Sequence, residues 1–232
     1  MTLVDTLDWA TKWVKAGRRG YLCTVNVAML MMMRTDPRLQ QFADGASLSV
    51  ADGQPLVWVS QLKRVRLPER VTGVDLLFLL CERAAKEGLK IYLLGARSEV
   101  VEMAAEKLRE RYDGLCISGF SDGYFTPEEA PDRARTIRES GAQILWLGMG
   151  VPRQEYFVAE HWQDLGVNLA IPVGGSFEVV AGRKKRAPVF LQKIGMEWCY
   201  RLCMEPRRLG KRYFTTNTQF FWLMLKDILA RH

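Results

Sequence analysis

Residues that could activate and hold a phosphorylated ligand stand directly after the β-prone runs of this sequence. In SLSVADGQPLVW (47–58), Asp52 and Gly53 end an apolar run and precede a stretch typical of a helix that begins near Pro55. A carboxylate at such a junction either caps the helix or accepts a proton from a substrate as a general base. Glycine permits tight turns, and the N–H groups of a helix start bind anions.

Similar residues follow the other β-prone runs, beginning with Thr24 and Asn26 in the first. The others are Gly95, Asp122, Gly123, Tyr124, Phe125, Gly148, Gly150, Pro152, Arg153, Gln154, Glu155, Gly174 and Gly175. Each has an ordinary explanation when taken alone, because proline and acidic residues suit a first helical turn and glycine suits a turn. Together they indicate a site only if their loops converge on one edge of the fold.

The elements that would position these residues alternate along the chain. The strand candidates are residues 21–27, 46–51, 90–95, 115–120, 143–149 and 167–173, and helical patterns lie near 73–87, 97–111, 127–140 and 153–165. Apolar strands separated by helix-length segments predict a Rossmann-like α/β fold, with a mostly parallel sheet covered by helices on both faces. In such a sheet the ligand binds outside the carboxyl ends of the strands.

Several other chemistries lack their signatures in this sequence. A dinucleotide site needs GxGxxG after the first strand, where TVNVAML stands instead, and GMGVPR places Arg153 where a third glycine belongs. His161 and His232 are the only histidines, and the sequence has no DxD, CxxC, HExxH or GxSxG motif. Cys199 and Cys203 lie one helical turn apart without a second ligand pair, which favours packing over metal binding. We therefore predict neither a metal nor a cofactor.

The positive charge of the chain is concentrated in its last 50 residues. Residues 183–232 contain twelve lysines and arginines against three acidic residues, whereas the whole chain has a net charge of +7. We therefore divide the chain into a Rossmann-like domain, residues 1–182, and a basic, aromatic, helical appendage, residues 183–232. Cations interleaved with rings suit the phosphates of a membrane surface. They also suit single-stranded nucleic acid, and the FFWLML segment suits a homo-oligomer interface.

The cysteines and the apolar runs of the chain predict its cellular compartment. Five cysteines are an odd number, and Cys23, Cys81 and Cys116 lie in apolar runs where a reduced thiol packs as a small hydrophobe. The N-terminal stretch has no signal-peptide core, and no apolar run approaches the roughly 18–20 residues that cross a bilayer. We expect a cytoplasmic protein that neither spans the membrane nor carries a standard export signal.

Nearly the whole chain resembles one enzyme family. The motifs are TVN (24–26), ADG (51–53), RVTGVDL (70–76), LLG (93–95), DGYF (122–125), GVPRQE (150–155), GGSFEVVAGRKKRAP (174–188) and EWCYRLCMEPRRLGKRY (197–213). In this order and spacing they are similar to the signatures of the WecG/TagA/CpsF glycosyltransferases. The chain starts at the family's first helix, so a leading strand is expected to be missing or shortened. The resemblance therefore leaves the strand count and the edge of the sheet open.

The resemblance implies an inverting, metal-independent enzyme that moves a sugar from a UDP-sugar to a polyprenyl-diphosphate-linked saccharide. It makes Asp52 the candidate general base, places Thr24, Asn26 and Gln154 in the catalytic set, and implies that the appendage docks on the inner face of the cell membrane. Nucleic acid is then not a partner. The predicted substrate-binding set is Arg70, Gly95, Phe125, Gly150, Pro152, Glu155, Gly174, Arg201, Arg208 and Arg212. Donors of the UDP-N-acetylmannosamine or UDP-glucose type are both compatible with the motifs. The rival readings are a basic nucleic-acid-binding module and a nucleotide-dependent oxidoreductase.

Overall fold

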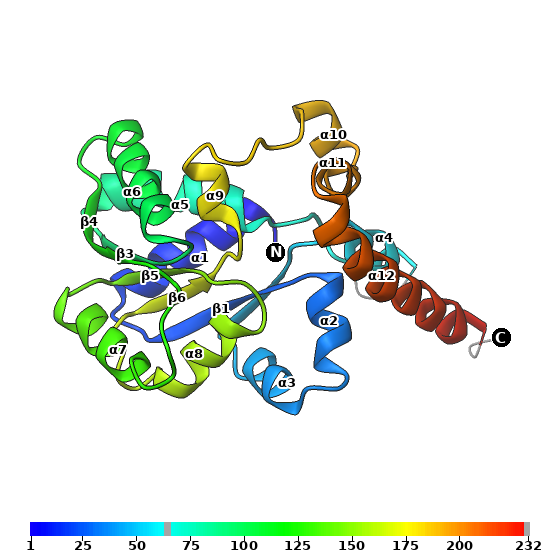
Figure 1. Cartoon of the computed structure of the whole chain (residues 1–232), viewed down its shortest axis with the longest axis horizontal. Helices are drawn as coiled ribbons and strands as arrows, with labels where there is room; N and C mark the ends of the chain where they lie inside the picture. The colour runs from blue at the N-terminus through cyan, green and yellow to red at the C-terminus, as the bar shows by residue number, and fades with distance from the viewer. Residues whose placement is uncertain (63–65, 230–232) are drawn as a thin grey trace.

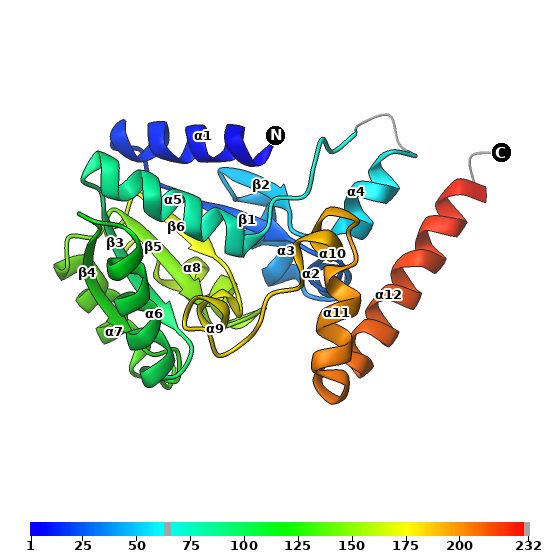
Figure 2. The ribbon, with the colours of Figure 1, turned by 90° about the horizontal axis from the view of Figure 1, so that it is seen from above.

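A computed structural model describes residues 1–62 and 66–229 of the chain. Within its helices, the side chains of Lys193, Arg208, Leu209, Leu225, residues 211–214 and residues 227–229 lie outside that description. The described chain forms a parallel sheet of six strands in the order β2-β1-β6-β5-β3-β4 (Figures 1 and 2). The strands are β1 (Gly20–Val25), β2 (Leu48–Ala51), β3 (Lys90–Gly95), β4 (Cys116–Ser121), β5 (Ile144–Gly148) and β6 (Leu169–Pro172). Strands β2 and β4 form the two edges of this six-stranded sheet.

Helices cover both faces of the sheet (Figure 1). One face is covered by α1 (Leu3–Lys15), α5 (Gly73–Glu87), α6 (Ser98–Arg111) and α9 (Ser176–Val180). The other face is covered by α2 (Val27–Met33), α3 (Pro37–Asp44), α7 (Ala130–Glu139) and α8 (Arg153–His161). The short helix α4 (Gln54–Ser60) follows β2. The predicted Rossmann-like fold is confirmed.

The alternation of side chains along the central strands explains why the sheet is covered twice. In β3, Leu93 points into the core cluster under α5 and α6, whereas Leu94 points into the cluster under α7 and α8. In β5, Trp146 and Leu147 divide between the two clusters in the same way. Because consecutive residues of a strand face opposite sides, a strand that is apolar throughout needs a cover on each face.

The appendage consists of α10 (Val189–Lys193), α11 (Glu197–Met204) and α12 (Pro206–Leu229). Both ribbon views place α11 and α12 beyond the end of β1 at which α2 begins (Figures 1 and 2). Phe220 is 1% exposed and packs between Val27 and Met31, which holds α12 against α2. The predicted division at residue 182 falls between α9 and α10. None of the described helices combines the length and the apolar character needed to cross a bilayer.

The structure ends the first strand earlier than the sequence pattern suggested. The predicted strand over 21–27 stops at Val25, because the Asn26 side chain accepts a hydrogen bond from Met29 N and caps α2. The predicted helix over 153–165 ends at His161. The other predicted strands and helices agree with the observed ones within about three residues, which is the usual uncertainty of element ends.

Leu93 and Leu79 provide a matched test of this core. Leu93 is fully buried at the centre of β3, so Leu93→Ala should lower the free energy of unfolding by about 2–5 kcal/mol. Leu79 on α5 is 37% exposed, and Leu79→Ala should cost about 0.5 kcal/mol or less. Urea denaturation of the two variants measures both values. Equal losses would contradict the described packing.

Candidate active site

Asp52 stands at the carboxyl end of β2 and does not cap a helix. Its backbone N–H donates to Val25 O at 2.7 Å, which fixes the loop beside the end of β1. Gly53 is the N-cap residue of α4, and no side chain caps this helix. Among the side chains that the structure describes, none donates a hydrogen bond to the Asp52 carboxylate. The first of the two readings of this residue, a helix cap, is therefore wrong.

A cleft opens beside Asp52, between the sheet and the appendage. Its lining residues are Asn26, Val27, Ala28, Asp52, Gly53, Gln54, Pro55, Arg70, Glu197, Trp198, Arg201, Thr216 and Asn217. They come from the loops after β1 and β2, from the starts of α2 and α4, from the loop before α5, and from α11 and α12, so both parts of the chain line the cleft. Of the predicted site residues, the structure brings Asn26, Asp52, Arg70 and Arg201 together here.

Glu197 joins the two arginines of the cleft. Its carboxylate is 2.8 Å from Arg201 Nη2 in the same helix and 3.1 Å from Arg70 Nη1 in the core. The Glu197 side chain is only 4% exposed and that of Arg70 only 15%, whereas that of Arg201 is 47% exposed. A buried carboxylate is stable only when cations or donors surround it. Glu197 therefore fixes two cations, one from each part of the chain, beside Asp52.

The same ion network extends into the core through Arg186. Arg186 Nη1 and Nη2 donate to Asp75 Oδ1 and Oδ2 at 2.5 and 2.6 Å, and Arg186 Nε lies 4.0 Å from Glu197 Oε1. Asp75 also accepts a hydrogen bond from Thr72 Oγ1 at 2.6 Å at the start of α5. The appendage is thus tied to α5 as well as to α2.

The protonation of Asp52 is set by opposing effects. Burial raises the pKa of its carboxyl group to about 7, against the positive charges of Arg201 and Arg70, which lower it. The negative charges of Glu197 and Asp75 add to the increase. Asp52 is partly exposed at the cleft, so a ligand can reach it. A carboxylate with a pKa near neutrality is suited to proton transfer at physiological pH.

Thr24 and Gln154 lie behind the cleft and do not line it. Thr24 Oγ1 donates to Pro172 O at 3.0 Å, which joins β1 to the end of β6. Gln154 is 1% exposed, and its Oε1 accepts from the backbone N–H groups of Gly150 and Gly174, both at 3.1 Å. One amide therefore connects the loops that follow β5 and β6.

Glu155 and Pro152 belong to the same support. Glu155 is 1% exposed, and its Oε1 accepts from Gln154 Nε2 at 2.8 Å, which orients that amide. Burial raises the pKa of Glu155 to about 7. Pro152 follows a cis peptide bond and is the N-cap residue of α8. These residues shape the loops, and the structure does not bring their side chains to the cleft.

Gly95 and Phe125 are explained by packing. Gly95 has φ of +144°, and a Cβ there would lie 2.4 Å from the carbonyl carbon of Gly148, so only glycine lets the ends of β3 and β5 approach. Phe125 stands edge-on to Phe157, with ring centroids 5.5 Å apart, and Arg153 lies over its ring. Neither residue lines the cleft. Arg208 and Arg212 fall in α12, with side chains outside the described part of the structure.

Glu197, Gln54 and Asn217 are among the lining residues that were not predicted from the sequence. A signal existed for Glu197, because a glutamate four residues before Arg201 in a helical pattern indicates an ion pair. For Gln54 and Asn217 no sequence signal is apparent, since exposed amides are common. The described residues contain no group of three or more His, Cys, Asp or Glu side chains that could hold a metal ion.

A parallel α/β sheet, with an acid and two arginines in a cleft at its carboxyl edge, defines a Rossmann-like protein whose cleft lies where ligands bind in this fold. The chain belongs to the glycosyl transferase WecG/TagA/CpsF family, whose model matches residues 1–232. The resemblance drawn from the motifs is thereby confirmed, and the chain is a glycosyltransferase.

Glu197→Gln tests the junction between the two parts of the chain. It keeps the side-chain shape but removes the charge that Arg70 and Arg201 face, so the free energy of unfolding should fall by roughly 1–3 kcal/mol. Trypsin should also cleave the appendage faster. Urea denaturation and mass spectrometry of the fragments measure the two effects.

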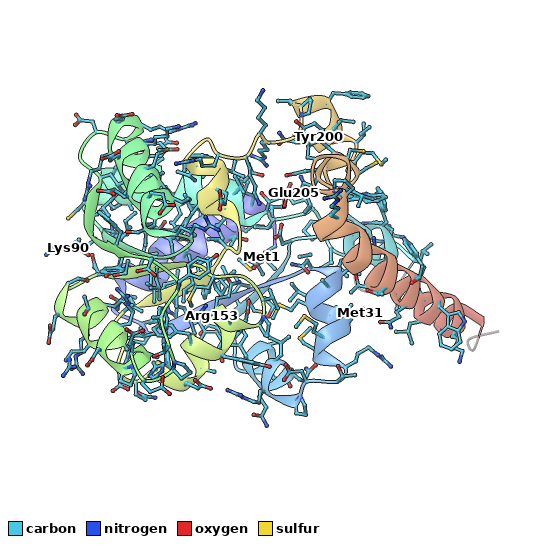
Figure 3. All side chains as sticks on the ribbon, viewed as in Figure 1. Met1, Met31, Lys90, Arg153, Tyr200 and Glu205 are labelled. Atoms are coloured by element: carbon cyan, nitrogen blue, oxygen red, sulfur yellow. The ribbon has the colours of Figure 1, made fainter. Side chains whose placement is uncertain are left out.

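Glu205→Gln is the matched control for this test. It breaks the more exposed pair between Lys184 and Glu205, 3.0 Å apart, and should cost less than about 1 kcal/mol. Figure 3 labels Glu205, together with Tyr200 on α11. Equal effects of the two substitutions would contradict a special role of Glu197 at the junction.

Proposed function

We propose that this glycosyltransferase is an inverting enzyme that uses a UDP-sugar donor. It moves a hexose or an N-acetylhexosamine, from a donor such as UDP-N-acetylmannosamine or UDP-glucose, onto an undecaprenyl-diphosphate-linked saccharide. The product would serve surface polysaccharide or teichoic-acid-type biosynthesis. The observation that carries the proposal is the position of Asp52 in one cleft with Arg70 and Arg201.

Asp52 would act as the general base in this reaction. A sugar hydroxyl is a poor nucleophile, and a carboxylate within hydrogen-bond reach can accept its proton while the bond to the anomeric carbon forms. The backbone hydrogen bond from Asp52 N to Val25 O fixes the main chain of Asp52 relative to the sheet. A base held in this way can act repeatedly on a substrate bound in one geometry.

Arg70 and Arg201 would receive the charge of the departing UDP. The diphosphate gains negative charge as the glycosidic bond breaks, and guanidinium groups bind phosphate oxygens in bidentate fashion. Both arginines line the cleft, and both are oriented by Glu197. In this proposal cationic side chains do the work that a divalent ion does in other nucleotide-sugar enzymes.

The appendage would rest on the inner face of the cell membrane. Phe190, Phe221 and Trp222 are 69%, 52% and 56% exposed, and they stand in the segment that carries most of the excess positive charge. Exposed rings and cations suit the headgroup region, where each cation contributes about 1 kcal/mol. Such docking would place the cleft near a lipid-linked acceptor. A homo-oligomer interface on the same apolar face is the alternative use of these rings.

Asp52→Asn should separate chemistry from binding. Loss of the base should lower kcat by about 10² to 10⁴-fold, while the affinity for UDP stays nearly unchanged because the arginines remain. Turnover in a buffer with EDTA and titration calorimetry with UDP measure the two quantities. Asp113→Asn, at an exposed turn, is the control and should match the unaltered enzyme. Nearly normal turnover of Asp52→Asn would remove the residue from its role.

The activity should rise with pH through the pKa of the base. Asp52 must be ionised to accept a proton, and its pKa is raised to about 7, so kcat/KM should increase between roughly pH 6 and 8 and then level off. The dependence of kcat/KM for the donor on pH, measured with a saturating acceptor, shows this rising limb. Because the pKa of Glu155 is also raised to about 7, Glu155→Gln is the control and should keep the limb. A flat profile of the unaltered enzyme would contradict the assignment.

A further inference from the structure

Three amide side chains from three different elements converge on the cleft that holds Asp52. Asn26 caps α2, Gln54 begins α4, and Asn217 lies in α12 of the appendage. An amide carries both donors and an acceptor, so it can match a hydroxyl group in either role. The placement of three such groups around one carboxylate suggests a site that recognises hydroxyls.

The hydrogen bonds of these amides leave most of their capacity for a ligand. Asn26 uses Oδ1 to accept from Met29 N at 3.1 Å, which leaves its NH₂ group available at the cleft. The side chains of Gln54 and Asn217 make no hydrogen bond with any residue that the structure describes. Because polar groups in a partly enclosed site need partners, a ligand with matching groups would gain specificity here.

The position of Asn217 is fixed by the packing of its helix. Phe220 lies three residues further along α12 and is buried between Val27 and Met31 of α2, which Figure 3 marks by its Met31 label. Residues three apart share one face of a helix. The contact of Phe220 therefore turns Asn217 toward the core and holds it at the cleft.

The amides and the charged residues come from different elements around the cleft. Arg201 and Glu197 belong to α11 and Arg70 to the loop before α5, whereas Asn26 caps α2 and Asn217 lies in α12. In an inverting displacement the nucleophile enters opposite the leaving group. If the arginines receive the diphosphate, the amides are left to contact the incoming alcohol, in the same cleft as Asp52.

We propose that Asn217, with Asn26 and Gln54, forms the subsite for the terminal sugar ring of the acceptor, and that Asn217 determines which hydroxyl pattern is accepted. This inference rests on the proposed function. It assigns to the appendage a part in acceptor selection in addition to its proposed contact with the membrane. In this proposal, Asn217 forms a hydrogen bond with one hydroxyl of the acceptor sugar, and Asp52 deprotonates a different one.

The test compares Asn217→Ala with Thr218→Ala, an exposed neighbour whose hydroxyl donates to Thr215 O at 3.2 Å in its own helix. The probes are short prenyl-diphosphate-linked N-acetylhexosamines: the complete sugar and analogues that each lack one hydroxyl. Asn217→Ala should raise the KM for the complete acceptor about tenfold, with the KM for the UDP-sugar unchanged. For one deoxy analogue, Asn217→Ala and Thr218→Ala should have the same KM, because this analogue lacks the hydroxyl that the Asn217 side chain would bind.

Three results would overturn the inference. Asn217→Ala could behave like Thr218→Ala with every acceptor, or it could raise the KM for the donor instead, and each result removes Asn217 from the acceptor subsite. If the unaltered enzyme transfers sugar to no acceptor and calorimetry detects no UDP binding, the proposed function fails together with the subsite. Thermal unfolding of both variants, expected to match the unaltered protein, shows that each folds.

Discussion

The buried carboxylate of Glu197 is the interaction on which the site depends. It pairs Arg201 of the appendage with Arg70 of the core, and its link to Arg186 reaches Asp75 at the start of α5. Removing such charges from water is costly, and the cost is offset only when all partners are in place. This requirement makes the pairing selective, since no arrangement without the appendage provides the same partners. The cleft therefore forms only when the appendage packs against the α/β domain.

The parallel sheet supplies the other half of the site. Since the strands run in one direction, every loop that follows a strand emerges at the same edge. Thr24 ties β1 to β6, and Gln154 connects the loops after β5 and β6 through Gly150 and Gly174. These polar contacts do not line the cleft, but they hold the strand ends and loops at this edge of the sheet in one arrangement. They give a structural role to motif residues that do not line the cleft.

Asp52 illustrates how the two halves act on one group. Burial at the end of β2 raises the pKa of its carboxyl group, and the arginines held by Glu197 limit that increase. Without the arginines the carboxyl would remain protonated at neutral pH, and without burial it would be a weaker base. The balance between these effects requires both the sheet edge and the appendage.

The sequence by itself determined the alternation of strands and helices, the parallel sheet and the family, because apolar periodicity and motif order are local or linear properties. It also identified Asp52, Asn26, Arg70 and Arg201, which the structure brings to one cleft. Only the tertiary structure separated them from Gln154, Glu155, Gly95 and Phe125, whose side chains support loops or pack in the core. It alone revealed Glu197, Gln54 and Asn217 at the cleft. The physical reason is that packing between distant segments decides which side of an element faces the ligand, and nothing in a single strand or helix encodes that contact.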